Sequence, residues 1–119
     1  MINRFAPYEG LLHEVVEHDG VLYIGGIVAE DTGLDMAGQA NDILGQLSRL
    51  LEGVGSDLSN VLQVTIYLTN LDEKEALNSA WMAHFARAHL PARAVIGVAY
   101  LGLGVELEMT AIAARRTSP

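Results

Sequence analysis

The spacing of hydrophobic residues changes several times along the chain, and the order of these changes constrains the fold more than any other feature. Residues 14–18 and 21–28 are β-rich and flank Asp19-Gly20, a dipeptide typical of tight hairpins because both central positions of the turn take positive φ. From Asp35 the apolar residues recur at steps of three and four, which predicts a helix. Its apolar stripe consists of Ala40, Leu44, Leu47, Leu51 and Val54. The first half of the chain is therefore expected to form a hairpin followed by a helix.

The second half repeats this change of period. Residues 61–69 alternate apolar and polar side chains, as a half-buried strand does. Asp72 and Glu75 resemble a capping box and begin a second predicted helix, which ends at Leu90-Pro91. The apolar face of this helix consists of Leu77, Trp81, Phe85 and Ala88, so Trp81 is expected in the core. Residues 92–99 and 105–113 then read as two further strands around a glycine-containing turn.

Strands that alternate with helices, with hairpins at both ends, predict an α+β fold, a two-layer sandwich with both helices on one face of a mixed sheet. We expect a single domain over residues 1–119, with a core from about residue 5 to residue 114 and a short frayed tail at 115–119. The chain has no further elements to cover the other face of the sheet. A homo-oligomer is therefore favoured, because neighbouring copies would cover that face.

The last two strands can be aligned as an antiparallel hairpin that puts their apolar residues on one face. This register places Arg93 opposite Glu108, with Val95, Gly97 and Glu106 on the same second face. Two interpretations stay open for the pair: a cross-strand ion pair, or a ligand site beside a glycine that allows close approach. Two interpretations also stay open for Gly25-Gly26: a β-bulge, or a segment whose backbone N–H groups bind a ligand.

Composition excludes several kinds of chemistry. The chain has no cysteine, so a thiolate nucleophile, a zinc knuckle and an iron–sulfur cluster are excluded, and a reducing cytoplasm is the expected location. Its net charge of -8 opposes binding to nucleic acid. No apolar run is long enough for a signal peptide or a membrane span, so a soluble protein is expected. His84 and His89 are five residues apart, off one helical face, and no histidine stands in a metal-binding motif, so neither a metal nor a cofactor is expected.

Several segments, in order along the chain, resemble those of the Rid family of reactive-intermediate deaminases, also called the YjgF family. Its signature blocks match Asn78-Ser-Ala-Trp81, Leu90-Pro-Ala-Arg93-Ala and Val105-Glu-Leu-Glu108-Met-Thr-Ala-Ile-Ala113. Weaker matches are Gly25-Gly26, Gln39 and Gly55-Ser-Asp-Leu-Ser. The resemblance covers nearly the whole chain.

The resemblance implies a chorismate-mutase-like fold assembled as a homotrimer, with sites in the clefts between subunits. It also implies hydrolysis of enamine and imine acids such as 2-aminoacrylate to 2-keto acids and ammonia, without a cofactor. By motif position, Arg93 would bind the substrate carboxylate, Glu108 would position or activate water, and Asn78 would be a site asparagine. The remaining positions implied for the pocket are Gly25, Gly26 and Val95. A guanidinium suits the anchoring role because it binds a carboxylate through two parallel N–H bonds, and a nearby Arg93 would keep Glu108 ionised.

The sequence also departs from the family pattern. Gly25 and Ile27 stand where serine and glutamine are frequent, Val95 stands where cysteine is frequent, and either Tyr8 or Leu12 takes the place of an N-terminal tyrosine. These changes argue for a bulkier or more apolar imine. They also leave open a non-catalytic trimeric module that binds a small carboxylate or a partner protein. The family's endoribonuclease and translation-inhibitor names would imply an RNA substrate, which the negative charge disfavours.

Overall fold

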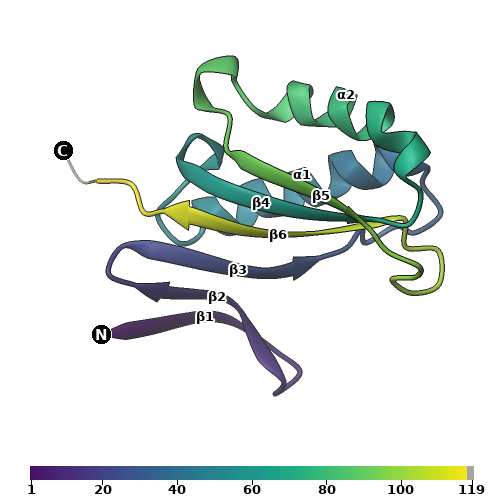
Figure 1. Ribbon diagram of the computed structural model, residues 1–119. Coiled ribbons are helices and arrows are strands. Elements are labelled where there is room, and N and C mark those ends of the chain that lie inside the picture. The colour runs from purple at the N-terminus through teal and green to yellow at the C-terminus, as the bar shows by residue number, and fades with distance from the viewer. Residues whose placement is uncertain (118–119) are drawn as a thin grey trace.

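Six strands form a mixed sheet in the computed structural model, which describes residues 1–117 (Figure 1). Their order across the sheet is β1-β2-β3-β6-β4-β5, with β4 and β5 parallel and the other neighbours antiparallel. The strands are β1 (Ile2–Tyr8), β2 (Leu12–His18), β3 (Val21–Ile27), β4 (Val61–Leu68), β5 (Ala92–Gly97) and β6 (Leu107–Ala114).

Two helices pack together on one face of this sheet (Figure 1). They are α1 (Met36–Glu52) and α2 (Lys74–His84), and three short 3-10 turns accompany them: η1 (Leu58–Asn60), η2 (Leu71–Glu73) and η3 (Arg87–His89). The predicted α+β two-layer sandwich is thus confirmed. Within residues 1–117, no helix is both long enough and apolar enough to cross a membrane.

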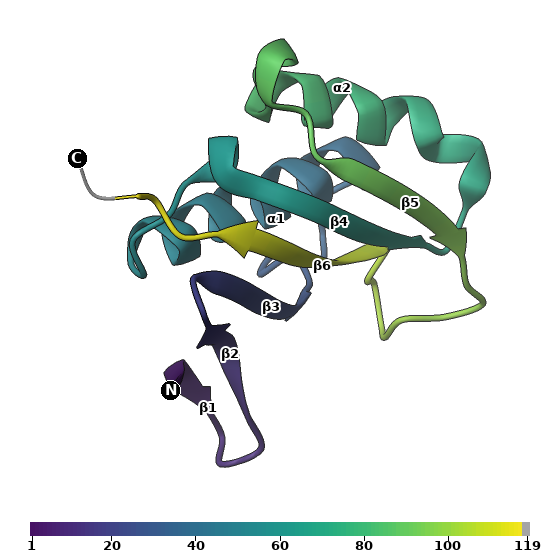
Figure 2. The same ribbon diagram turned by 60° about the vertical axis from the view of Figure 1, so that its left-hand side comes forward.

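The hairpin between β2 and β3 forms where the sequence predicts it. Asp19 and Gly20 both have positive φ, 51° and 79°, as a tight hairpin turn requires. Ahead of it lies β1, which the hydrophobic pattern does not predict and which pairs with β2. Figure 2 shows the β1–β2 hairpin turning away from the other strands.

The second helix differs from its predicted boundaries at both ends. Asp72 does not cap it: α2 begins at Lys74, and its N-cap residue, Glu73, makes no side-chain cap hydrogen bond. The side-chain cap lies one turn earlier, where Asn70 Oδ1 accepts a hydrogen bond from the backbone N–H of Asp72 at 3.0 Å and begins η2, which leads into α2. The helix ends at His84 because Phe85 is already extended. The first helix begins as expected, since the side chain of Asp35 accepts from the N–H of Gly38 at 2.9 Å.

The predicted hairpin between the last two strands is wrong. β4 lies between β5 and β6: Val64 of β4 pairs with Arg93 on one side and with Ala111 on the other. The physical reason is the helix between β4 and β5, which returns the chain so that β5 runs parallel to β4. The following segment, residues 98–106, then passes over the end of β4 to reach β6.

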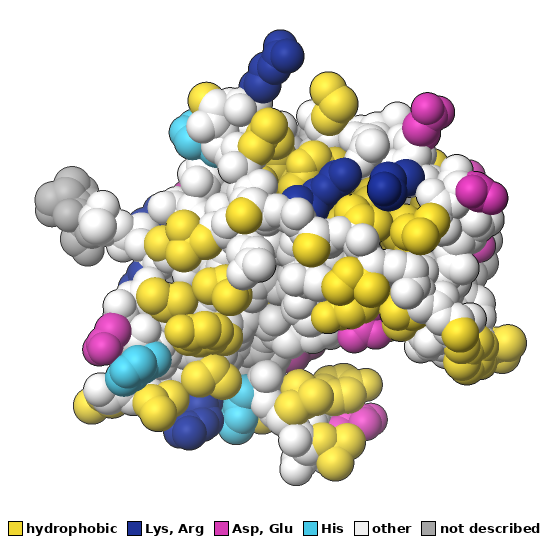
Figure 3. Space-filling view, viewed as in Figure 1, with side chains coloured by type: hydrophobic (Ala, Val, Ile, Leu, Met, Phe, Trp, Pro, Cys, Tyr) yellow, Lys and Arg dark blue, Asp and Glu magenta, His cyan; other side chains and the backbone are white. Residues whose placement is uncertain are grey.

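The core lies between the helices and one face of the sheet. Side chains that are wholly buried there come from both layers: Val15, Leu22, Ala40, Ile43, Leu44, Leu47, Leu51, Val64, Ile66, Leu68, Leu77, Leu107 and Ala113. No element within residues 1–117 covers the opposite face (Figure 1). Tyr23 and Ile96 lie on that open face and are 48% and 43% exposed. Figure 3 shows hydrophobic side chains in several groups across it.

The end of the chain is held against the sheet, so the expectation of a frayed tail is wrong for Arg115 and Arg116. The backbone N–H of Arg115 donates to the carbonyl of Gly20, and that of Arg116 donates to the carbonyl of Gly55, each at 2.9 Å. The guanidinium of Arg115 also lies 2.7 Å from the buried carboxylate of Glu17. Ser118 and Pro119 of that predicted tail lie outside the described residues.

Arg116 is paired with Asp57, and this pair gives the fold an acid-sensitive contact. Asp57 accepts hydrogen bonds from Ser59, Asn60 and Arg116, and these contacts, that of Ser59 above all, lower its pKa from 3.8 to about 2. A carboxyl group whose pKa is depressed by folding stabilises the protein above its unfolded pKa, and that stability is lost as the pH falls through the folded value.

We therefore expect Asp57→Asn to lose part of the pH dependence of stability between pH 4 and pH 2. The effect on the free energy of unfolding should be about 1 kcal/mol, less than the full pKa shift would give, because solvent reaches this loop. Urea unfolding at a series of pH values measures it. Asp72→Asn is the matched control, since Asp72 is exposed and its carboxylate accepts no hydrogen bond within residues 1–117. Equal slopes for wild type and Asp57→Asn would contradict this expectation.

Candidate functional site

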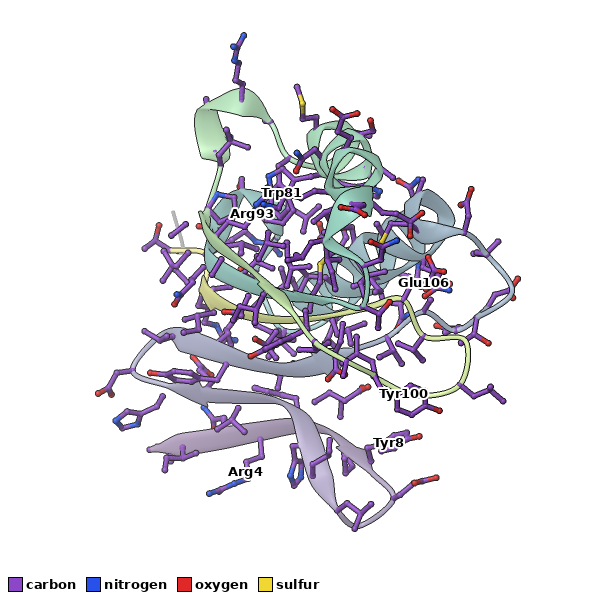
Figure 4. All side chains as sticks on the ribbon, turned by 45° about the vertical axis from the view of Figure 1, so that its right-hand side comes forward. Arg4, Tyr8, Trp81, Arg93, Tyr100 and Glu106 are labelled. Atoms are coloured by element: carbon purple, nitrogen blue, oxygen red, sulfur yellow. The ribbon has the colours of Figure 1, made fainter. Side chains whose placement is uncertain are left out.

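Arg93 presents a positive charge that nothing in the described chain neutralises. It lies on β5, the edge strand, and its register with Val64 puts its side chain on the helix-covered face. Its Cζ lies 5.0 Å from the centre of the Trp81 ring (Figure 4). Within residues 1–117 no carboxylate lies within ion-pair distance of it. Partial burial lowers the pKa of Arg93, although a guanidinium stays charged at any working pH. Such a group suits an anion that comes from outside the chain.

Trp81 supplies the surface on which Arg93 rests. The indole is only 6% exposed, and its ring lies 4.4 Å from that of Phe85, tilted by 40°. Trp81 is thus part of the core, as the helical pattern predicts. A guanidinium over an aromatic face at this distance is attracted by about 0.5–2 kcal/mol, depending on its exposure to solvent.

Asn78 lies one helical turn before Trp81 on α2. Its Oδ1 is buried and accepts no hydrogen bond within residues 1–117. A buried acceptor without a donor is costly, so this oxygen is available to a group from outside the chain. The structure thus places Asn78 and Arg93 on the same side of the sheet, both near Trp81.

Glu108 lies elsewhere, on the open face of the sheet. It pairs with Tyr67 on β4, and its carboxylate lies directly against Gly26, where a Cβ atom on residue 26 would collide with Oε2. The pairing of β3 with β6 shifts register between Ile24 and Ile27. Gly25-Gly26 therefore forms a β-bulge, one of the two possibilities that the sequence left open. The bulge brings the backbone of Gly26 against the carboxylate of Glu108.

A hollow of about 430 Å³ lies beside this bulge. Its lining residues come from β1, β2, the end of β3, the segment that follows β3, and α1: Tyr8, Leu12, Glu14, Gly25, Gly26, Ile27, Val28, Ala29, Glu30, Gln46 and Leu50. Tyr8 and Leu12, the two candidates for the N-terminal site residue, pair with each other across β1 and β2. Both line the hollow, and Tyr8 brings a phenol to it.

Arg93 and Glu108 do not meet within one chain, which corrects the predicted register. They lie on opposite faces of the sheet and on strands separated by β4. With two strand spacings between them and an offset of three residues along the strands, their Cα atoms are roughly 14 Å apart. Arg93 and Glu108 therefore cannot form the predicted cross-strand pair inside a single chain. Val95 lies with Arg93 on the helix-covered face, in register with Ile66, and is likewise remote from the hollow.

Gln39, beside the start of β6, has structural partners that the sequence does not reveal. The wholly buried amide of Gln39 donates to the carbonyls of Leu34 and Gly104, each at 2.9 Å, and accepts from the N–H of Glu106 at 3.0 Å. Burial and the nearby carboxylates of Glu73 and Asp35 raise the pKa of Glu106. Gln39 thus ties the ends of two loops together.

The histidines do not contribute to a metal-binding cluster within the described residues. His84 Nε2 lies 3.1 Å from Asn41 Oδ1, which links α2 to α1, and burial lowers the pKa of His84. In the part of the chain that the structure describes, no three histidine, aspartate or glutamate side chains are grouped so that they could hold a metal ion.

The sequence analysis did not predict the contact between Trp81 and Arg93. The signal that could have found it is the βαβ order of β4, α2 and β5, because the helix of such a unit packs over both strands. A residue on the helix-covered face of β5 must then lie beneath α2.

Two proteins of known name are similar in sequence to more than two thirds of this chain. A match of 81 residues to Protein HMF1 of Saccharomyces cerevisiae is 37% identical and covers 68% of this chain but 62% of that protein. A match of 110 residues to the 2-iminobutanoate/2-iminopropanoate deaminase of Rattus norvegicus is 29% identical and covers 87% of this chain and 80% of the rat protein.

A solved structure and a family sequence profile also match this chain over nearly its whole length. A crystal structure of a YjgF-family member from Neisseria meningitidis superposes with a TM-score of 0.91 at 28% identity, covering 99% of this chain and 98% of that one. The sequence profile described as Endoribonuclease L-PSP matches residues 1–115. The chain belongs to this family, the Endoribonuclease L-PSP family, also known as the YjgF or Rid family.

Proposed function

We propose that this protein hydrolyses enamine and imine acids to 2-keto acids and ammonia. The observation that carries the proposal is Arg93: a guanidinium fixed on an aromatic ring at a sheet edge, with no carboxylate partner within residues 1–117. A charged group that remains uncompensated at a fixed place is what recognition of a substrate carboxylate requires. The deaminase name of the rat relative supports the same reaction.

Glu108 is the proposed acid–base group. A protonated imine carbon is electrophilic, so its hydrolysis needs an oriented water and a proton acceptor. Water adds to C2 while Glu108 takes one of its protons, which gives a carbinolamine. Glu108 then returns the proton to the nitrogen and the C–N bond breaks. The hydroxyl proton on the C2 oxygen passes to the departing ammonia, which leaves as ammonium, and the C2–O bond becomes the carbonyl of the keto acid. The residue ends in its starting state, and no metal or cofactor takes part.

The two halves of this proposed site require two copies of the chain. Arg93 at the β5 edge of one copy would face Glu108 on the open sheet face of the next. Such a contact joins two different surfaces, and its repetition closes into a ring when the rotation between neighbouring copies is a whole fraction of a turn. We propose a homotrimer, as the family resemblance implies, with three such clefts. The exposed apolar side chains of Tyr23 and Ile96 support the burial of this face.

The hollow beside Gly25-Gly26 supports an imine with a larger apolar side chain than that of 2-aminoacrylate. Leu12, Ile27 and Leu50 contribute to its wall, and aliphatic walls favour an apolar group. As the place of the reaction we propose the cytoplasm, which a chain without cysteine permits.

An imine generated in place tests the proposal. An L-amino-acid oxidase releases imines from alanine, leucine or methionine, and semicarbazide captures whatever imine has not yet been hydrolysed. Added protein should lower the semicarbazone yield and raise that of free keto acid, more strongly for leucine than for alanine. Tight binding of a keto acid without any such change would instead indicate a carboxylate-binding module. Cleavage of RNA with no effect on imines would overturn the proposal.

Gly26→Ala should remove activity with little loss of stability. The new Cβ collides with the carboxylate of Glu108, which is the end of a flexible side chain and can move away. We expect a fall in kcat of about 10- to 100-fold, because a displaced base no longer lies within reach of the water, and a change in melting temperature of only a few degrees. Gly45→Ala on α1 is the control, since a Cβ there meets only Arg49 Nη1 at 3.5 Å. Wild-type activity of Gly26→Ala would exclude the assigned role of Glu108.

A further inference from the structure

The ring of Trp81 holds Arg93 in a way that no ion pair could. An aspartate or glutamate partner would also fix the guanidinium, but it would occupy the N–H groups and cancel the charge. An aromatic face attracts the flat side of the guanidinium and leaves the N–H groups in its plane free. Cζ of Arg93 lies 5.0 Å from the ring centre, within the distance at which a cation is attracted to an aromatic face.

The ring is itself immobile. Trp81 is 6% exposed, belongs to the core, and packs against the ring of Phe85 at 4.4 Å. Arg93, in contrast, projects from an edge strand and has many rotatable bonds, which cost entropy when a ligand fixes them. A rigid platform lowers that cost before any ligand arrives. Figure 4 shows Arg93 lying next to Trp81 between β5 and α2.

We propose that Trp81 is a positioning residue, which holds the guanidinium of Arg93 ready to bind a carboxylate with its N–H groups unoccupied. This rests on the carboxylate-anchoring part of the proposed function, and not on the hydrolysis step. It follows that Trp81 governs carboxylate affinity and KM far more than kcat. It also follows that the indole senses an anion at Arg93, because the charge above it changes. Trp81 is the only tryptophan of the chain, so its fluorescence reports on this site alone.

Fluorescence titration of the wild-type protein is the first experiment. Pyruvate serves as the carboxylate probe, and pyruvamide, which has the same shape without the charge, is its control. Tryptophan emission should change with pyruvate in a saturable way and should not change with pyruvamide. Arg93→Ala should abolish the response. No saturable response in the wild-type protein, or an equal response in Arg93→Ala, would overturn the inference.

Variants of the ring are the second experiment, read by calorimetric titration of pyruvate and by steady-state kinetics. Trp81→Leu should weaken pyruvate binding and raise KM about tenfold while kcat changes by less than about threefold, because the cation–π contact is lost and the chemistry is not. Trp81→Phe keeps an aromatic face and should lie within about threefold of wild type. Phe85→Leu removes the neighbouring ring without removing the platform, and it is the matched control for a loosened core.

The outcomes separate positioning from packing and from catalysis. Equal weakening in Trp81→Leu and Phe85→Leu would mean that Trp81 only packs the core, and a loss confined to kcat would also overturn the inference. If Trp81→Leu does not fold, the saturable response of the wild-type indole to pyruvate, and the loss of that response in Arg93→Ala, decide the matter. A protein without imine hydrolysis that nevertheless binds pyruvate through Arg93 and Trp81 would refute the proposed reaction and support the inference.

Discussion

Arg93→Ala is expected to lower kcat/KM for every imine acid by about 10²- to 10³-fold, because two charge-assisted hydrogen bonds to the substrate carboxylate are lost. A lysine at this position keeps the charge but not the paired geometry, so Arg93→Lys should recover only part of the loss. The oxidase-coupled assay with semicarbazide measures both variants. The fold should survive, since Arg93 makes no ion pair within residues 1–117.

The control for this result is Arg87→Ala. Arg87 is an exposed arginine in η3 that forms no ion pair in the described part of the chain, so its removal costs the same net charge without touching the proposed anchor. Its kcat/KM should stay near that of the wild-type protein. If Arg93→Ala and Arg87→Ala lose activity equally, the loss is caused by the change in net charge and not by the removal of a carboxylate-binding residue. An unchanged rate in Arg93→Ala would rule out Arg93 as the anchor.

Local signals predict the elements that depend on local interactions. The Asp19-Gly20 turn needs positive φ at both residues, and it has it. The stripe from Ala40 to Leu51 is buried as its period requires. In contrast, β1 has the sequence INRFAPY, which lacks alternation and contains a proline. It is a strand because β2 offers it a free edge, and a tertiary contact of this kind leaves no mark in the hydrophobic pattern.

The pairing of β5 illustrates a second limit. An alternating pattern states which residues share a face, but it does not state which strand lies alongside. The positions 93, 95 and 97 do share a face, yet that face is covered by α2, and the neighbour of β5 is β4 rather than β6. Arg93 and Glu108 could therefore be chosen from the sequence as candidate site residues, whereas their mutual position could not.

For Asn78, too, the sequence predicts the candidate residue and only the structure shows its surroundings. Its resemblance to a site asparagine can be read from the motif, but the burial of its Oδ1 without a donor is visible only in the structure. Likewise, the spacing of Trp81 predicts a core residue, and the structure adds the contact with Arg93. Residue types and local periods are properties of the sequence, whereas the partners of each side chain depend on the topology.

Because Arg93 and Glu108 lie on opposite faces of the sheet, the proposed homotrimer with shared sites predicts that two inactive variants restore activity to each other. Arg93→Ala and Glu108→Gln copies, each nearly inactive alone, are mixed and refolded together. A shared site works only where a copy with an intact arginine meets a neighbour with an intact glutamate. Random mixing of equal amounts makes that true of roughly a quarter of the sites, so roughly a quarter of the wild-type rate should return.

A third variant makes this result specific. The double variant Arg93→Ala/Glu108→Gln, mixed with Arg93→Ala, forms oligomers that contain intact glutamates but no arginine at position 93, and it should recover nothing. Native mass spectrometry verifies that the mixed oligomers contain three copies of the 12.8 kDa chain. If mixed trimers form and stay inactive, the two residues do not act across a subunit boundary. Since one chain holds them roughly 14 Å apart on opposite faces, that result would also remove Glu108 from the reaction at the Arg93 site.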